Sequence, residues 1–291
     1  MKIFQLGEFG LIDELSKYAL LSKNVIKGIG DDAAVLSYSQ REYQLFTTDM
    51  LAEGTHFTRR MPPEGIGHKA LACNISDIAA MGGWPTFAVI SIGVPKNLSV
   101  SYIKGVYRGI ERVALDYNVS IVGGDTIKTD TIVINVALLG LVKKKNLVTR
   151  DGARPGDWIF VTGPLGGSLA SGRHLSFTPR LAQARFLVEK FSPSAMMDIS
   201  DGLSGDLNHI LKASQVGARL NEALVPRPKG VSLSQAFNDG EDFELLFTLS
   251  AKKARALMDW QAVQRSFYFY PIGSITADVK EKINAKSFTH F

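Results

Sequence analysis

The sequence predicts an α/β domain over residues 1–146 followed by an α+β domain over residues 147–291. Three observations carry this prediction. Strand-like and helix-like patterns alternate in the first half, turn-forming residues cluster over 149–157, and strand-like and helix-like patterns begin again after that cluster. A chain of 291 residues is also long enough for two domains that each bury a core.

The first half contains short β-rich runs and longer runs in which alanine and aliphatic residues recur at helical spacing. Gly82 and Gly83 follow the first helical run and are expected to end it. The predicted order is strand 44–48, helix 67–81, strand 86–94, helix 100–117, strand 119–122 and strand 131–142.

The second half is separated from the first by the sequence Thr-Arg-Asp-Gly-Ala-Arg-Pro-Gly-Asp at 149–157, where a core element cannot run. We therefore place the domain boundary at this segment. The predicted elements after it are a strand over 158–162, a glycine-rich turn over 163–167, two helices, a strand near 244–249 and an aromatic strand over 267–272.

The composition is that of an ordinary folded protein, with 45% apolar and 21% charged residues, and it argues against a disordered or multi-span membrane protein. The longest apolar run, 131–142, is about half of what a bilayer crossing needs. The N-terminus lacks the apolar segment of a signal peptide, and Cys73 is the single cysteine, so we expect a cytoplasmic protein without a cysteine metal site. The net charge of +5 comes from scattered lysines, which does not favour nucleic-acid binding.

Common catalytic motifs are missing: the sequence contains no Walker A phosphate loop, no H-E-x-x-H and no G-x-S-x-G. It offers instead a series of acidic residues that we expect to end or interrupt secondary structure. They lie in Gly28-Ile-Gly-Asp-Asp32, Thr47-Thr-Asp49, Asn74-Ile-Ser-Asp77, Gly123-Gly-Asp-Thr126, Asp198-Ile-Ser-Asp-Gly202 and Gly240-Glu-Asp242.

Taken singly, an aspartate beside a glycine is most simply a turn residue. That explanation weakens for Asp49, which has no glycine beside it, and for Asp77, which lies in an alanine-rich helical run. If the acids converge, each close pair repels by about 4 kcal/mol at an effective dielectric constant of ~20, so cations must balance them. Oxygen ligands without histidine or cysteine favour Mg²⁺, which commonly bridges carboxylates to phosphates.

Taken together, the motifs resemble those of the thiamine-monophosphate kinases, in order from Glu8 to about Leu249. The motifs that carry the resemblance are Glu8-Phe-Gly-Leu-Ile12, Gly28 to Ala33, Thr47 to Asp49, Gly54-x-His-Phe57, Lys69 to Gly82, Gly123 to Thr126, Arg150 to Asp157, Asp198 to Leu203 and Gly240 to Glu244. The resemblance implies the two-domain aminoimidazole ribonucleotide synthetase-like architecture and a homodimer joined through the N-terminal sheets. It also implies ATP and several Mg²⁺ in the cleft, with thiamine monophosphate as the acceptor.

The resemblance also implies roles for particular residues. The magnesium ligands would be Asp32, Thr47, Thr48, Asp49, Asp77, Asp125, Asp198 and Asp201. ATP would contact Gly124, Asp125, Arg150 and Ser200, and the catalytic group would be Asp49, Asp125 and Arg150. His56 and Glu241 match acceptor-binding positions, and Phe288 is expected to cover the thiamine because Ala285 stands where relatives often carry a tryptophan.

This reading predicts in-line phosphoryl transfer from ATP to thiamine monophosphate, the final step in making thiamine diphosphate. A phosphate monoester has a second pKa near 6, so the acceptor oxygen is largely deprotonated at neutral pH and needs no general base. Two alternatives remain at this point. One is an ATP-dependent synthetase of the aminoimidazole ribonucleotide or selenophosphate type, and the other is a non-catalytic sensor of a nucleotide or of thiamine phosphate.

Overall fold

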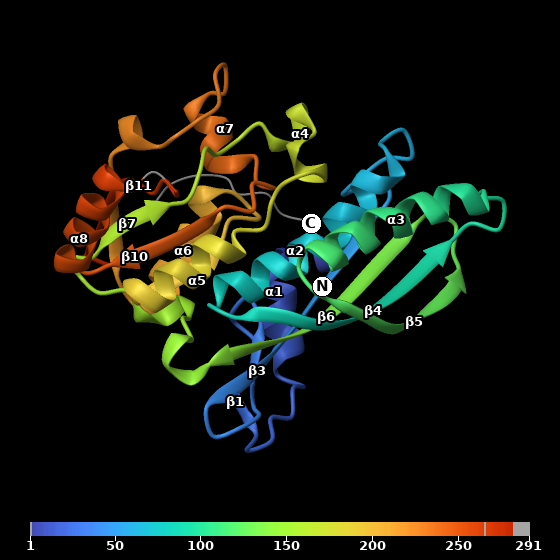
Figure 1. Cartoon of the computed structure of the whole chain (residues 1–291), viewed down its shortest axis with the longest axis horizontal. Helices are drawn as coiled ribbons and strands as arrows, with labels where there is room; N and C mark the ends of the chain where they lie inside the picture. Colours follow the sequence, from blue (N-terminus) through green and yellow to red (C-terminus); the bar gives the residue numbers. More distant parts are fainter. Residues whose placement is uncertain (1, 265, 282–291) are drawn as a thin grey trace.

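The structure is a computed structural model that describes residues 2–264 and 266–281. Two β-sheets organise it, one on each side of the segment 149–157 (Figure 1). The first sheet consists, in spatial order, of β1 (Val25–Lys27), β2 (Ala34–Ser37), β3 (Glu42–Ala52), β6 (Val133–Lys143), β4 (Trp84–Val94) and β5 (Ser120–Lys128). Its neighbouring strands are antiparallel except β4 and β5, which are parallel.

One face of the first sheet is covered by α2 (Pro63–Ala80) and α3 (Val100–Asp116) (Figure 1). The two helices pack backbone against backbone, because a Cβ at Gly67 would lie 1.8 Å from the carbonyl oxygen of Val106 and one at Gly109 would lie 1.9 Å from that of Glu64. Their bounds agree closely with the predicted helices. The helix that carries Asp77 is therefore held closely against α3.

The other face of the first sheet is open and apolar. Side chains alternate along each strand, so the residues that do not face α2 and α3 point to the opposite side. The exposed apolar residues on this open face are Phe46, Met50, Phe87, Val89 and Ile127. An apolar surface of this kind marks a contact region.

The second sheet is antiparallel, in the order β8 (Ala195–Asp198), β10 (Leu245–Leu249), β7 (Trp158–Val161), β11 (Tyr270–Thr276) and β9 (Gly217–Leu220). The helices of this half are α4 (Ser168–Ser171), α5 (Leu181–Lys190), α6 (Leu203–Ser214), α7 (Leu233–Asn238) and α8 (Ala251–Val263). Short 3₁₀ turns lie at Lys144–Asn146, Arg150–Gly152, Arg173–Leu175 and Glu222–Leu224. The core of this half buries β10 on both sides of the sheet.

The expectation that each acidic motif ends or interrupts an element is wrong for three of them. The motif from Asn74 to Asp77 lies inside α2, which continues to Ala80. Asp49 lies inside β3, and β5 continues through Gly123, Gly124 and Asp125. A Cβ at Gly124 would lie 1.8 Å from the carbonyl oxygen of Ile90, so glycine here permits close strand pairing rather than a break.

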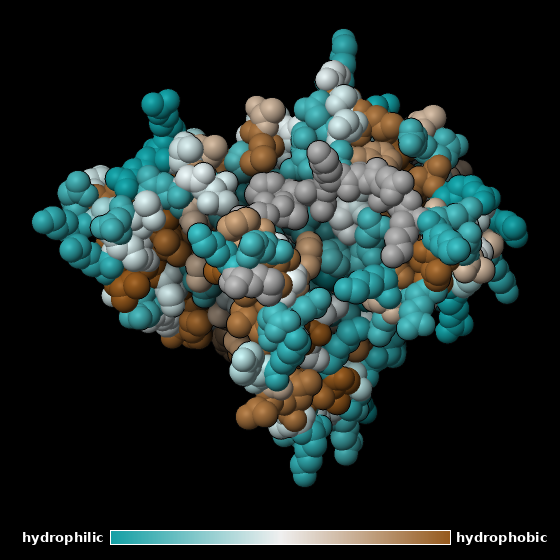
Figure 2. Space-filling model, turned by 180° about the vertical axis from the view of Figure 1, so that it is seen from behind, coloured by the Kyte–Doolittle hydropathy of each residue, from teal (hydrophilic) through white to brown (hydrophobic). Residues whose placement is uncertain are grey.

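No residue of the N-terminal helix α1 (Ile3–Ser16) is fully buried. Exposed apolar residues continue beyond it, including Leu20 and Leu21. Figure 2 shows apolar side chains gathered on the lower projection of the molecule, which is the blue N-terminal part in Figure 1. Within residues 2–264 and 266–281, no helix combines the length and the apolar character that a membrane crossing needs.

Candidate active site

Three predicted metal ligands meet where the two halves of the chain touch. Asp32 comes from the loop between β1 and β2, Asp77 from α2, and Asp198 from the end of β8. One carboxylate oxygen of each lies within 4.8 Å of the other two. Residues more than 160 positions apart in the sequence are thus brought to one point.

Each of these carboxylates is held by a neighbouring group. The Thr47 hydroxyl donates to Asp77 Oδ2 at 2.6 Å, and the Ser76 hydroxyl donates to Asp198 Oδ2 at 2.5 Å. A guanidinium nitrogen of Arg150 donates to Asp32 Oδ1 at 2.5 Å. The other oxygen of Asp32, Oδ2, is buried without a hydrogen-bond partner.

Burial makes ionisation of these acids costly. It raises the pKa of Asp32 to about 7 although Arg150 opposes the shift, and it raises the pKa of Asp49 and of Asp198 to about 6. Burial, with repulsion from Asp49, lifts the pKa of Asp77 well above its ordinary value. A buried oxygen without a partner and several crowded carboxylates fit a hard divalent cation such as Mg²⁺.

Arg150 is built into this cluster and is not a surface linker residue. Its side chain is only 19% exposed, and its backbone N–H donates to Asp31 Oδ2 at 3.2 Å. The carboxylates of Asp32 and Asp31, of which Asp32 has the larger effect, keep the pKa of the Arg150 guanidinium above its usual range despite burial. The turn that carries Arg150 is also packed closely, since a Cβ at Gly152 would lie 1.8 Å from the carbonyl oxygen of Ser194.

A polar hollow lies beside the cluster and brings six more of the predicted site residues together. They are Thr48, Asp49, His56, Ser200, Asp201 and Glu241, and the hollow is also lined by Glu8, Met50, Leu51, Lys69, Cys73 and Phe243. Asp49 connects the hollow to the cluster, because its carboxylate interacts with Asp77. The hollow and the cluster form one continuous acidic site.

The two predicted acceptor-binding residues are positioned by local structure. His56 Nδ1 accepts a hydrogen bond from the backbone N–H of Ala52 at 3.0 Å. Glu241 has a φ of 59°, in the left-handed region, and its N–H donates to the carbonyl oxygen of Ser200 at 2.7 Å. Such a conformation is unfavourable for a residue with a side chain, and such residues cluster at functional sites.

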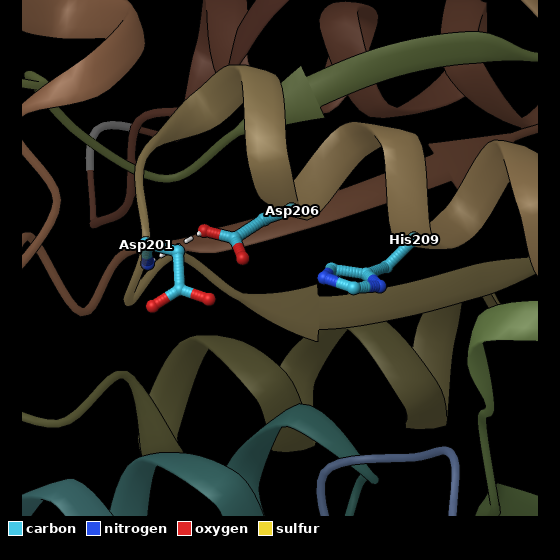
Figure 3. Close-up of side chains that lie close together, drawn as sticks. All are labelled: Asp201, Asp206 and His209. Atoms are coloured by element: carbon cyan, nitrogen blue, oxygen red, sulfur yellow. Dashed lines mark hydrogen bonds between the residues drawn. The ribbon is translucent and has the colours of Figure 1, made fainter. Parts of the chain in front are cut away.

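Asp201 belongs to a second group, which Figure 3 shows with Asp206 and His209. The Asp201 backbone N–H donates to Asp206 Oδ2 at 3.1 Å, so Asp206 in the first turn of α6 fixes the loop that carries Ser200 and Asp201. Burial lowers the pKa of His209 to about 4. Asp206 was not predicted, although its place five residues after Asp201, just beyond the motif from Asp198 to Leu203, was a usable signal.

Two predicted residues lie on strand β5, away from the cluster. Asp125 is paired in register with Ser91 and lines a separate hollow with Ser91 and Asn135 on the open face of the sheet. Gly124 is its neighbour on the same strand. Thr48 also reaches the open face, where its hydroxyl lies 3.0 Å from the carbonyl oxygen of Val136. Phe288 lies outside the described residues.

Two acids of the Gly240–Glu244 motif hold the structure together. Asp242 pairs with Arg173 at 2.5 Å and accepts from the Gly166 N–H at 2.8 Å. Glu244 pairs with Arg180 at 2.5 Å and accepts from the Thr162 hydroxyl. Of the three acids in this motif, only Glu241 lines the acidic hollow.

The chain matches known families over both halves. Residues 30–142 match the N-terminal domain of AIR synthase related proteins, and residues 154–286 match their C-terminal domain. The predicted combination of an α/β and an α+β unit is thereby confirmed.

Curated relatives and solved structures agree with each other. A thiamine-monophosphate kinase of Aquifex aeolicus is 37% identical over 294 residues, which cover 91% of this chain and 93% of the relative. One from Bacillus subtilis is 33% identical over 311 residues, covering 97% and 95%. A solved structure described as AaThiL complexed with AMPPCP and TMP superposes with a TM-score of 0.88, at 35% identity, over 100% of this chain and 99% of that one.

Proposed function

The chain belongs to the thiamine-monophosphate kinase family, and we infer that it transfers the γ-phosphate of ATP to thiamine monophosphate, giving ADP and thiamine diphosphate. The observation that carries this inference is the convergence of Asp32, Asp77 and Asp198 with Arg150 beside a hollow lined by His56 and Glu241. A relative of the same fold binds AMPPCP and TMP. We place the reaction in the cytoplasm because ATP is a cytoplasmic metabolite.

The physical problem of this reaction is to bring two polyanions together, and the residues of the site address it. Mg²⁺, when bound, neutralises phosphate charge and aligns the reacting groups. In the cluster and the hollow, Asp32, Asp49, Asp77, Asp198 and Asp201 would hold it, with support from Thr47 and Thr48. Arg150 adds a guanidinium that is held in a fixed position. The backbone around Gly124 and Ser200 would bind the nucleotide. Asp125 keeps its proposed ligand role, although it lies on the open face of the sheet.

The acceptor itself needs no general base, because its phosphate oxygen is already largely deprotonated at neutral pH. This explains why His56 need not act as a base. The chain's contribution is to bind, orient and neutralise.

The test of this function is phosphorus NMR of the protein with MgATP and thiamine monophosphate. A kinase gives equal growth of ADP and thiamine diphosphate and no free phosphate. Release of free phosphate without thiamine diphosphate would favour the synthetase alternative and contradict the kinase.

We expect Arg150→Lys to weaken the use of MgATP more than the binding of thiamine monophosphate. A planar guanidinium grips two oxygens at once, whereas an ammonium does not. The KM for MgATP should rise about tenfold or more, an effect of ~1.4 kcal/mol, while the KM for the acceptor changes less than threefold. Equal changes in both constants would contradict the assignment of Arg150 to the nucleotide.

We further propose that the protein is a homodimer joined through the open face of the first sheet. The support is the exposed apolar side chains on that face, including Phe46, Phe87 and Ile127. Two sheets packed through such a face would bury it in both copies.

The dimer predicts that Phe87→Lys yields a monomer at micromolar concentration in light scattering coupled to size exclusion, because it places a charge in a buried apolar contact. Phe87 is 50% exposed in one protomer, so the monomer should still fold. Val263→Lys, on exposed surface of α8, is the matched control and should remain dimeric. A dimeric Phe87→Lys protein would contradict this interface.

A further inference from the structure

Lys69 is a buried lysine that has received no role so far. Its side chain is 1% exposed, and it is one of the largest fully buried side chains among the described residues. Burying an ammonium group is costly unless it is paired. Here it lies beside the acidic hollow, and its Nζ is 2.5 Å from Glu241 Oε2 and 3.4 Å from the carbonyl oxygen of His56.

The helix places Lys69 in line with the metal cluster. Lys69, Cys73 and Asp77 are spaced four residues apart on α2 and therefore share one helix face. Eight residues of helix rise about 12 Å. A phosphate that contacts Lys69 thus lies along the same helix face that presents Asp77 to the cluster.

The charges around the hollow make Lys69 unusual. Glu8, Asp49, Asp201 and Glu241 line it with carboxylates, whereas Lys69 is the one lysine or arginine among the described lining residues. Its positive charge also favours ionisation of Asp49. An anionic ligand entering this hollow meets a single side-chain ammonium.

Thiamine monophosphate is a zwitterion with a cationic thiazolium ring and an anionic phosphate. The pair formed by Lys69 and Glu241 has the same two charges, and it joins α2 of one half of the chain to the Gly240–Glu244 loop of the other. Glu241 is 16% exposed and lines the hollow together with Lys69, so a ligand in the hollow lies next to this pair.

We propose that the Lys69–Glu241 ion pair exchanges partners when the acceptor binds, so that Lys69 binds the acceptor's phosphate and Glu241 faces its cationic part. One internal ion pair is replaced by two pairs with the ligand, and neither buried charge is left alone. Lys69 is therefore a binding residue for the acceptor, and it determines the preference for the phosphorylated ligand over unphosphorylated thiamine. This inference rests on the proposed function, because it takes the acceptor from that function.

The experiment measures binding of thiamine monophosphate and of unphosphorylated thiamine by calorimetry, with Mg²⁺ and a non-hydrolysable ATP analogue present. The variants are Lys69→Met, Lys69→Arg and the double variant Lys69→Met/Glu241→Gln. Lys253→Met is the matched control, since Lys253 lies on α8, donates to the carbonyl oxygen of Ser192 and does not line the hollow.

We expect Lys69→Met to weaken the binding of thiamine monophosphate at least tenfold and to change the binding of thiamine less than threefold. Lys69→Arg should restore much of the lost affinity, because it keeps the charge. If Lys69→Met does not fold, the double variant replaces it, since removing both charges leaves no unpaired ion. In that variant the preference for the phosphorylated ligand should also fall at least tenfold.

If Lys69 only links the two halves of the chain, Lys69→Met weakens the binding of both ligands equally and lowers the melting temperature. That result would overturn the proposal. Failure of the proposed function looks different: the wild type would show no phosphorylation by NMR, whether or not Lys69 determines the preference for the phosphate.

Discussion

Asp49→Asn is expected to lower kcat/KM by at least about 100-fold while the protein stays folded. The substitution keeps the volume of the side chain and removes a charge that would hold Mg²⁺ against the phosphates, a loss of several kcal/mol in the transition state. Asp49 lies where the hollow meets the cluster, so both substrates depend on it. Steady-state kinetics over a range of Mg²⁺ concentrations measure the effect.

Stability provides the second half of this prediction. Burial raises the pKa of Asp49 to about 6, so its ionised form opposes folding of the metal-free protein at pH 7.5. Asp49→Asn should therefore leave the metal-free melting temperature unchanged or higher. Asp259→Asn, an exposed change on α8, serves as the control that alters neither quantity. Near-normal activity of Asp49→Asn at low Mg²⁺ would show that Asp49 is not a metal ligand.

The helices α2 and α3 and the long strands β4 and β6 were predictable because their signal is local, whereas the described residues of the second half form five helices and only two were predicted. The helical periodicity of α2 and α3 can be recognised in consecutive residues, and the predicted ranges agree with the observed helices within a few positions. The short strands β1, β2, β8 and β9 have three or four residues each and were missed, because so few residues carry no period. Gly123 and Gly124 were wrongly predicted to end a strand, since glycine permits close strand pairing as well as turns.

The site was predictable to the extent that it consists of recognisable motifs. The spacing of residues in the sequence does not show which groups contact the acidic and basic side chains of the site. The contacts of Ser76, Asp206 and Lys69 were therefore identified only in the structure. Ser76 meets Asp198 from 122 positions away, a contact that only the packing of the two halves creates. Phe288, the expected cover of the thiamine, stays a prediction.

The metal cluster should also give the metal-free protein an unusual dependence of stability on pH. The folded pKa values of Asp32, about 7, and of Asp49 and Asp198, about 6, lie above the ordinary value of 3.8. Between pH 4 and pH 7 the folded protein then binds more protons than the unfolded chain, so stability falls as the pH rises through this window. The three carboxylates interact, so they lose their protons as a group across this window and not one by one.

His209 changes the pH dependence of stability in the opposite direction, so its effect must be separated from that of the carboxylates. The pKa of His209 is lowered to about 4, which adds stability as the pH rises toward 6.5. The informative quantity is therefore the increase in melting temperature caused by Mg²⁺, which compares the same protein with and without the ion at each pH. Cations that balance ionised carboxylates stabilise only where the carboxylates are ionised.

We therefore expect millimolar Mg²⁺ to raise the melting temperature by several degrees at pH 7.5 and by little at pH 5, relative to EDTA. Asp198→Asn should shrink the increase at pH 7.5, because it removes one of the three clustered carboxylates. Calcium in place of magnesium tests whether charge alone suffices. An equal increase at both pH values would mean that the ion binds elsewhere, since protonated carboxyls at pH 5 cannot hold it as the ionised cluster does at pH 7.5.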